Sequence, residues 1–260
     1  MFVQSKRVAA GALLAVPLAL MATAAPAQAK TMQTYTFSLD ALKGSDARGT
    51  ATLTAMSDGD LKVKIHATGL VPKMPHAQHI HGDTDGHRYF CPTASADKDN
   101  DGFITVEEGL PMYGNINISL TTKGDTSPKS GLAVDRMPVA SASGVVDYSR
   151  TIPAGQLPKG TLAALQHLHI VQHGVDANDN QKYDLKGLGE STFAKSLGVS
   201  GIPAEATDAA DCGMVMPSGS VDTGGTTTAG VEHGGLIGGG VAALFAAAGA
   251  FVVRRRLARG

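Results

Sequence analysis

The stretch ATLTAMSDGDLKVKIHA, residues 51–67, contains two runs of alternating apolar and polar residues separated by the turn SDGD at 57–60. Successive side chains of a β-strand point to opposite faces, so this alternation places the apolar residues of each run on one face. Asp-Gly between two such runs is typical of a hairpin turn. The stretch therefore predicts two antiparallel strands with one buried face. The apolar positions are Ala51, Leu53 and Ala55, then Leu61, Val63, Ile65 and Ala67.

The same alternation recurs in both directions from this stretch, with Gly, Pro, Asp and Asn between the runs. A short helical pattern precedes the C-terminal apolar segment only at 193–197. Short alternating runs with frequent turns predict an all-β fold, an antiparallel Greek-key sandwich or a barrel. The further apolar positions are Tyr35, Phe37 and Leu39, then Ile116, Ile118 and Leu120, then Val146 and Tyr148, then Leu168 and Ile170.

Both ends of the chain indicate export and anchoring. Residues 1–29 have a basic start, an apolar run and a small-x-small cleavage site, which is the pattern of a signal peptide. Residues 234–253 carry no charge and are long enough to cross a bilayer as a helix. The basic tail 254–260 predicts a cytoplasmic C-terminus by the positive-inside rule. We expect a single-pass protein of the cell membrane with its N-terminal domain outside the cell.

The part between these ends is predicted to be one domain and a tether. Residues 217–233 are rich in Gly, Thr and Ser and have too few apolar residues to form a core, so they predict a flexible linker. Residues 30–216 fit one domain by length. All 23 acidic residues but only 16 of the 22 basic ones lie outside the two ends, which gives 16 − 23 = −7. This charge argues against nucleic acid as a partner and suits cation binding.

The chain has two cysteines, Cys91 and Cys212. An even number of cysteines in an exported protein predicts a disulfide, with two free thiols as the alternative.

Residues 97–108, DKDNDGFITVEE, match the twelve-residue calcium loop of an EF-hand. Gly102 stands where the loop turns sharply, and the residues before the loop are not helical. A calcium site is therefore predicted within a domain that is not an EF-hand, and an acidic solvated turn is the alternative. The predicted ligands are Asp97, Asp99, Asp101, Phe103 through its carbonyl, Thr105 and Glu108.

A second acidic segment, residues 176–184, has partial calcium-loop spacing but neither a turn glycine nor a closing glutamate. A second calcium site and an Asx-rich turn fit this segment equally well. Its candidate ligands are Asp176, Asn178, Asn180 and Asp184.

Seven of the nine histidines fall in two clusters, residues 76–87 and 167–173. On a strand, His79 and His81 share one face, as do His167, His169 and His173. Two neighbouring strands that offer imidazoles on one side predict a transition-metal site for copper or zinc, with structural histidines as the alternative.

Several of these pieces resemble known families. LKVKIHATGL at 61–70, followed by HAQHIHG at 76–82, resembles the CHRD domain of bacterial exported proteins. The order of H-x-H, Cys91, IVQH at 170–173 and CGMV at 212–215 also resembles copper-zinc superoxide dismutase. The resemblance implies a Greek-key β-sandwich, copper ligands at His79, His81 and His173, and a Cys91–Cys212 disulfide.

The chain also departs from the dismutase pattern. The calcium loop stands where a bridging histidine and a zinc subloop would follow the first cysteine, and Ala209 replaces the expected active-site arginine. A copper-only centre would need a fourth ligand from His76, His87 or His169.

Two functions therefore follow from the sequence. The first is a membrane-anchored extracellular CHRD-like module that binds calcium and a transition metal in a structural or binding role, without catalysis. The alternative is a copper-dependent redox enzyme of the superoxide dismutase type. A third reading, adhesion to a protein or matrix partner, has no specific motif to support it.

Overall fold

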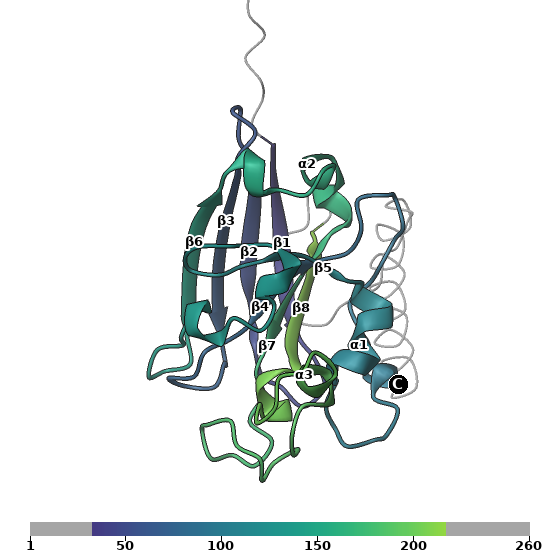
Figure 1. The fold of residues 1–260 in the computed structure, drawn as a ribbon, viewed down its shortest axis with the longest axis vertical. Helices are drawn as coiled ribbons and strands as arrows, with labels where there is room; N and C mark the ends of the chain where they lie inside the picture. Colours follow the sequence, from purple (N-terminus) through teal and green to yellow (C-terminus); the bar gives the residue numbers. More distant parts are fainter. Residues whose placement is uncertain (1–32, 217–260) are drawn as a thin grey trace, which may run out of the picture. The chain divides into compact units, whose positions relative to one another are not determined.

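The computed structural model of the chain describes residues 33–216, in which eight antiparallel strands form one sheet (Figure 1). The order of the strands is β5-β4-β7-β8-β1-β2-β3-β6. The prediction of an all-β antiparallel fold is confirmed. The strands are β1 (Gln33–Ala41), β2 (Arg48–Ala55), β3 (Leu61–Thr68), β4 (Gln78–His81), β5 (Ile116–Ser119), β6 (Val146–Ile152), β7 (His169–His173) and β8 (Ala209–Val215).

The β2–β3 hairpin forms where the alternating pattern places it. Leu53 lies opposite Val63 in the ladder, and both side chains are buried. The turn is closed by the Met56 N–H, which donates to the Asp60 carbonyl at 2.8 Å. Gly59 has a φ of +94°, a conformation that a residue without Cβ adopts at no steric cost.

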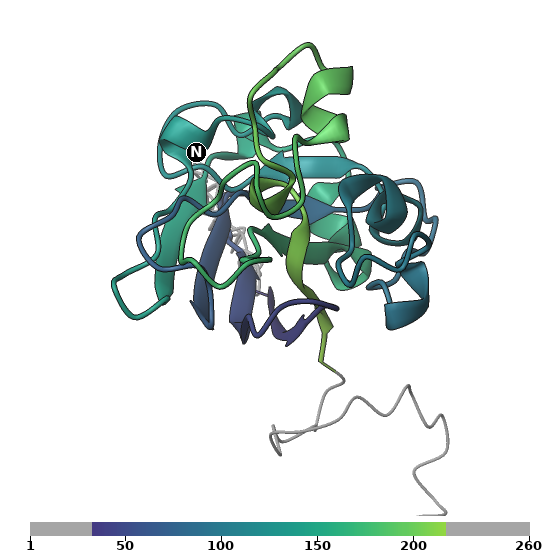
Figure 2. The same ribbon diagram turned by 90° about the horizontal axis from the view of Figure 1, so that it is seen from below.

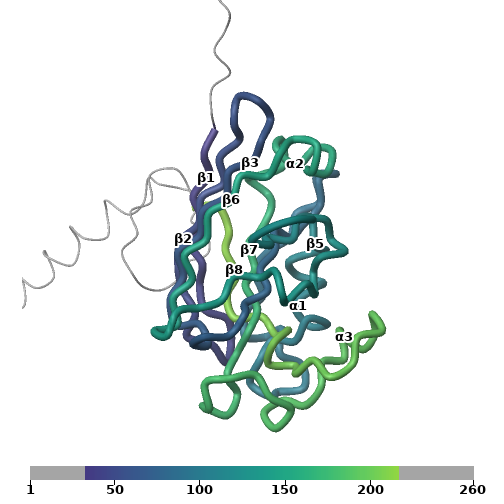
Figure 3. The backbone as a smooth tube through the Cα atoms, turned by 60° about the vertical axis from the view of Figure 1, so that its left-hand side comes forward, coloured from purple at the N-terminus to yellow at the C-terminus, as the bar shows by residue number. Residues whose placement is uncertain are grey.

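The sheet divides into two halves whose inner side chains share one core. Strands β1, β2, β3 and β6 form one half, and strands β5, β4, β7 and β8 form the other (Figure 3). Figure 2 shows the purple and blue strands β1 to β3 on one side and the blue-teal turns around α1 on the other. The shared core includes Phe37, Leu53 and Ile65 from the first half and Ile80, Ile118 and Ile170 from the second.

The edge strands β5 and β6 do not pair, and side chains link them instead. The Tyr148 hydroxyl and the Arg150 guanidinium on β6 both donate to the carbonyl of Thr121, which follows β5, at 3.0 and 2.6 Å. The open side of the sheet is therefore joined by these hydrogen bonds rather than by a ladder.

Three short α-helices accompany the sheet, of which only one was expected. They are α1 (Val106–Tyr113), α2 (Thr161–Ala164) and α3 (Thr192–Ser196), and α3 coincides with the predicted pattern at 193–197. Short 3-10 turns occupy η1 (Ala94–Ala96), η2 (Pro128–Ser130), η3 (Val134–Arg136), η4 (Ala154–Gln156), η5 (Leu165–His167) and η6 (Ala204–Ala206).

Helix α1 follows the predicted calcium loop, where the sequence shows no long helical period and no helix was predicted. Thr105 caps this helix, and Glu108 completes a reciprocal capping box with it. A capping box satisfies two of the free N–H groups at a helix start, which supports a helix despite Gly109 and Pro111. Thr-x-x-Glu was the signal that sequence reasoning overlooked.

Cys91 and Cys212 form the predicted disulfide, with their Cα atoms 5.6 Å apart. Closing a loop of this length stabilises the fold by about 4–5 kcal/mol in the chain-entropy description. Cys212 lies on β8, opposite Asp40 on β1, and Cys91 lies in the segment before the predicted calcium loop. The disulfide therefore ties the last strand to that segment.

The predicted signal peptide (1–29), linker (217–233), membrane span (234–253) and basic tail (254–260) lie outside the described residues. Within residues 33–216, no helix has both the length and the apolar character that a membrane crossing requires.

A row of buried polar side chains runs across β4, β7 and β8. Gln78 lies opposite Gln172, and Gln172 lies opposite Asp211. The Gln172 amide donates to Gln78 Oε1 at 2.9 Å, while Gln172 Oε1 and both Asp211 oxygens have no partner. Asp211 is fully buried, and burial raises the pKa of its carboxyl well above the ordinary value. A protonated Asp211 would supply the O–H that the free Gln172 Oε1 needs.

Asp211→Asn tests this assignment through the pH dependence of stability. The wild-type carboxyl holds its proton in the fold but loses it in the unfolded chain above about pH 4. Its contribution to stability is therefore present at low pH and is lost as pH rises toward the folded pKa. We expect denaturation midpoints of the variant and the wild type to agree near pH 4, and the variant to be more stable near pH 8. Parallel curves across that range would contradict the assignment.

Candidate metal centres

Three histidines predicted as ligands meet on one face of β4 and β7. Ile80 of β4 points into the core, so its neighbours His79 and His81 point to the opposite face. His173 ends the adjacent strand β7. The ring centroids lie 5.1 Å apart for His79 and His173, 5.4 Å for His79 and His81, and 6.1 Å for His81 and His173. All three side chains are buried, and that they bind a metal stays a prediction.

Each imidazole uses one nitrogen for a backbone carbonyl and leaves the other free. A neutral imidazole carries an N–H on one nitrogen and a lone pair on the other, so these bonds place the lone pairs on His79 Nδ1, His81 Nε2 and His173 Nε2. These three atoms are buried and have no hydrogen-bond partner. The three residues offer ligand atoms within 4.8 Å of one another. The carbonyl pairs are His79 Nε2–Gly131 O (3.1 Å), His81 Nδ1–Gly114 O (2.8 Å) and His173 Nδ1–Thr207 O (2.6 Å).

The surroundings keep these imidazoles neutral. Burial, with a smaller contribution from His173, lowers the pKa of His81 to about 3. Burial also lowers the pKa of His173 to about 4 and that of His79 well below its ordinary value. Only a neutral imidazole can donate a lone pair to a metal, so the three residues are in the ligating form at neutral pH.

The three histidines line a small cavity of about 30 Å³. A cavity of this size has room for a metal ion. Apart from the histidines, its wall is mostly apolar. The apolar wall residues are Ala77, Val106, Leu110, Ile116, Leu132 and Phe193.

The other clustered histidines do not join this group. Both ring nitrogens of His76 have polar neighbours: the carbonyl oxygens of His173 at 2.9 Å and Val71 at 3.1 Å, and the Tyr183 hydroxyl at 3.1 and 3.2 Å. His87 is exposed and its ring lies against Tyr89. His169 is buried with a free Nδ1, but it lies outside the three-residue group. The expected fourth ligand is therefore not found among these residues.

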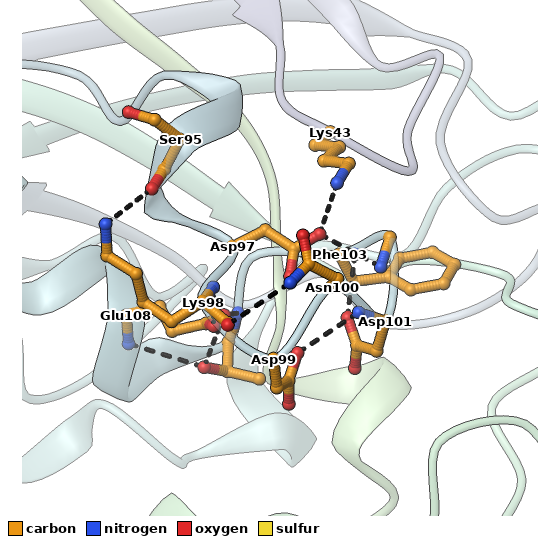
Figure 4. Close-up of polar contacts among 11 residues, drawn as sticks. Lys43, Ser95, Asp97, Lys98, Asp99, Asn100, Asp101, Phe103 and Glu108 are labelled. Carbon is orange, nitrogen blue, oxygen red and sulfur yellow. Dashed lines mark hydrogen bonds and ion pairs between the residues drawn. The ribbon is translucent and has the colours of Figure 1, made fainter.

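In the predicted calcium loop, aspartate oxygens accept backbone N–H groups of the loop itself (Figure 4). Asp97 Oδ2 accepts the Gly102 N–H at 3.1 Å, Asp99 Oδ1 accepts the Asp101 N–H at 3.2 Å, and Asp101 Oδ1 accepts the Phe103 N–H at 2.9 Å. Gly102 takes a φ of +99° at the sharp turn. Asp97, Asp99 and Glu108 bring ligand atoms within 4.8 Å of one another, so half of the predicted calcium ligands converge.

Asp97 is the inner carboxylate of this loop. Its side chain has no exposed surface. Oδ2 forms an ion pair with the Lys43 ammonium, while Oδ1 is buried without a hydrogen-bond partner. The loop therefore holds a carboxylate oxygen that the protein itself leaves unsatisfied.

The second acidic segment is closed by a residue that sequence reasoning missed. Glu205 is fully buried and accepts the N–H groups of Ala177 and Asp184, the second and ninth positions of the segment, at 3.0 and 2.7 Å. Glu108 accepts the N–H groups of Lys98 and Thr105, the same two positions of the first loop, at 2.6 and 3.0 Å.

Glu205 reaches the second segment through space that a glycine leaves. Gly187 is the twelfth residue counted from Asp176, and a Cβ on it would lie 2.2 Å from Glu205 Oε1. The amides of Asn178 and Asn180 donate to Asp184 at 3.3 and 2.8 Å. These contacts are those of an Asx-rich turn, and no group of three carboxylates converges there within residues 33–216. Calcium binding by Asp176 and its neighbours stays a prediction.

No protein-family model matches the chain, and no curated protein matches it. Among solved structures, the chain is similar to Candida albicans superoxide dismutase 5 in its Cu(II) form, at 14% identity, with 75% of this chain and 100% of that chain covered and a TM-score of 0.36. A single-residue mutant of the same enzyme gives 13% identity, 74% and 99% coverage and a TM-score of 0.35. Likeness at this level carries no argument about function or ligands, and the CHRD resemblance stays a prediction.

The Tyr113 ring packs against His81 and leaves no room for a side chain at Gly109. The Tyr113 ring is fully buried, with its centroid 4.6 Å from that of His81. A Cβ on Gly109 would lie 2.4 Å from Tyr113 Cε1, so any side chain there would displace the ring.

Gly109→Ala should therefore destabilise the fold by about 1–3 kcal/mol, as overpacking of a core does, despite the better helix propensity of Ala. Chemical denaturation of the variant measures this effect. Gly155→Ala is the matched control, because nothing lies within 4 Å of its Cβ position. Equal stability of the two variants would show that the contact with Tyr113 is not restrictive.

Proposed function

We propose that the chain is a copper-binding protein whose centre is formed by His79, His81 and His173. The observation that carries the proposal is the set of three buried imidazole nitrogens that face one another and have no hydrogen-bond partner. An unpaired buried polar atom costs free energy, and three such atoms aimed at one small cavity are explained by a bound ion.

Copper fits this centre better than zinc. Imidazole suits both metals, and divalent copper binds nitrogen ligands more strongly than zinc in the Irving–Williams order. Neutral imidazoles cancel no charge, and an apolar wall makes a dication more costly to bury than a monocation. Copper can be held as the monovalent ion, whereas zinc cannot.

The carbonyl groups behind the imidazoles fix each ring. The oxygens of Gly131, Gly114 and Thr207 each hold one ring nitrogen, so the opposite nitrogen is oriented before the metal arrives. The apolar wall limits access of water. A bound copper ion would supply one-electron redox chemistry at this position.

A dismutase-type redox activity is the alternative function, and the order of the histidine and cysteine pieces favours it. The cavity is lined by no lysine or arginine among the described residues, and Ala209 stands where the resemblance expects an arginine. Without a cation to attract superoxide, we infer a binding rather than a catalytic role. We also interpret the antiparallel sheet as a Greek-key sandwich of CHRD or superoxide dismutase type.

Metal loading of the purified full-length chain tests the copper proposal. We expect one copper ion per chain by mass spectrometry. Loss of a residue that only hydrogen-bonds a metal ligand weakens metal affinity roughly 10–100-fold, so His81→Ala or His173→Ala, which removes a ligand itself, should weaken copper binding by more than that. Retention should persist to about pH 5, because proton competition begins only near the lowered histidine pKa values. His87→Ala, at an exposed histidine, should bind copper like the wild type.

Equal copper content in the wild type and His81→Ala would overturn the proposed centre. A superoxide-consumption assay on the loaded protein separates the two functions. Rapid turnover that is lost in His81→Ala would favour the dismutase alternative, and copper binding without turnover would favour the binding role.

We propose a second, structural role for the loop 97–108 as a calcium site. The unsatisfied Asp97 Oδ1 and the convergence of Asp97, Asp99 and Glu108 favour it over a solvated turn. Ca²⁺ takes six to eight hard oxygen ligands, which the loop residues and water supply.

Calcium should therefore raise the melting temperature of the full-length chain, and chelator should lower it again. Glu108→Gln should abolish most of this shift, because it removes the bidentate carboxylate charge. Glutamine can still complete a capping box, so the start of α1 is kept in this variant. A melting temperature that changes with neither calcium nor chelator would exclude the site.

The location of the protein is proposed from the sequence alone. The terminal segments indicate an exported domain displayed at the outer surface of the cell membrane by a single C-terminal span.

A further inference from the structure

A second cavity, of about 290 Å³, shares its walls with the histidine cavity. Three segments contribute to both. Val106 and Leu110 of helix α1 line the histidine cavity, whereas the glutamates of the same helix line the second cavity. Phe193 lines the histidine cavity, whereas Ser191 and Thr192 line the second. The adjacent residues Thr207 and Asp208 line the histidine cavity and the second cavity, respectively.

This second cavity is lined mainly by carboxylates and hydroxyl groups, with Leu188 and Ala204 beside them, and no lysine, arginine or histidine is among its lining residues within the described part of the chain. Like charges gathered in one hollow repel one another unless a cation lies between them. We call it the acidic cavity. Its carboxylates belong to Asp99, Asp101, Glu107, Glu108, Glu190 and Asp208.

Asp208 is the member of the acidic cavity that the fold does not explain. Its exposed fraction is 2%, and its Oδ2 is buried with no hydrogen-bond partner. The nearby buried Glu205 is different, because two backbone N–H groups satisfy it. A buried carboxylate without a donor or a cation is strongly unfavourable.

The electrostatics of Asp208 favour a cation beside its carboxylate. Burial, followed by the charges of Asp101, Glu107, Glu108 and Asp99, raises the pKa of Asp208 to about 8. A proton would remove the charge but would leave Oδ2 without a donor. A metal ion would instead satisfy the oxygen and the neighbouring carboxylates together.

We propose that the acidic cavity binds one Ca²⁺ ion and that Asp208 supplies a ligand to it from outside the loop 97–108. The inference rests on the calcium site proposed for that loop and adds a ligand that no loop motif contains. Asp99, Asp101 and Glu108 face the same cavity. All the donors are hard oxygens, and the volume leaves room for water, which suits the flexible coordination of Ca²⁺ better than the compact octahedron of Mg²⁺.

The ion would join two segments that are distant in sequence. One backbone bond already links them, from the Ala209 N–H to the Ile104 carbonyl at 3.0 Å. Coordination by Asp208 would add a second link next to Thr207, whose carbonyl orients His173. Calcium in the acidic cavity therefore stiffens the wall on which the histidine centre depends.

Calorimetric titration of the full-length chain with CaCl₂ tests the role of Asp208. We expect Asp208→Asn to weaken calcium binding about 10-fold or more, since affinity at such sites follows the number of charged ligands. The same variant should show a smaller calcium-induced rise in melting temperature. Asp211→Asn is the matched control, because Asp211 is also a buried, unpartnered aspartate among the described residues but does not line the acidic cavity. Its calcium affinity should equal that of the wild type.

The outcomes distinguish this inference from the loop proposal. Calcium binding by the wild type that is unchanged in Asp208→Asn but lost in Glu108→Gln would overturn the role of Asp208 and leave the loop site in place. No calcium binding by the wild type would overturn both. Equal weakening in Asp208→Asn and Asp211→Asn would show a general effect on the fold and would also overturn the inference. Because asparagine has nearly the same shape without the buried charge, we expect the metal-free Asp208→Asn chain to fold.

Discussion

The pairing of β8 with β1 on one side and β7 on the other is the contact on which the rest of the structure depends. It joins the half formed by β1, β2, β3 and β6 to the half that carries the histidines. Strand β8 is the last strand of the described chain, and its ladders to β1 and β7 are the backbone pairing that joins the two halves of the sheet. The residues just before it, Thr207 and Asp208, then fall between the two cavities. Both candidate metal centres thus depend on one late strand.

Much of the sheet was predictable from the sequence, because a half-buried strand shows apolar and polar residues in alternation along a short stretch of chain. The alternation around Leu53 and Val63 predicts β2 and β3, and the turn at Gly59 follows from local turn chemistry. Helix α1 was missed because it is only eight residues long and contains Gly109 and Pro111, although Val106, Leu110 and Tyr113 follow a helical spacing. Its start is instead specified by a capping box, which the calcium-loop motif includes in its last four positions.

The two candidate centres were predictable to different degrees. His79, His81 and His173 have a sequence signature, since alternation on adjacent strands places them on one face. Glu205 and Asp208 have none, because each acts on a segment far from it in sequence and their function is set by tertiary packing. The same holds for the carbonyl oxygens that orient the imidazoles. Side-chain type could therefore be inferred locally, whereas burial and the satisfaction of hydrogen bonds required the folded structure.

The disulfide also determines how the molecule would carry tension. A force applied between Gln33 and Met216 passes from Cys212 through the sulfur–sulfur bond to Cys91. The residues between the two cysteines are therefore left out of the covalent load path. The loop 97–108, β7 and Asp208 all lie in this unloaded part, whereas β4 lies in the loaded part. Two of the three histidines are therefore on a strand under load and the third is on one that is not. Tension along the chain would therefore be carried directly by the strand that holds His79 and His81, whereas the loop 97–108 and Asp208 lie outside the covalent load path.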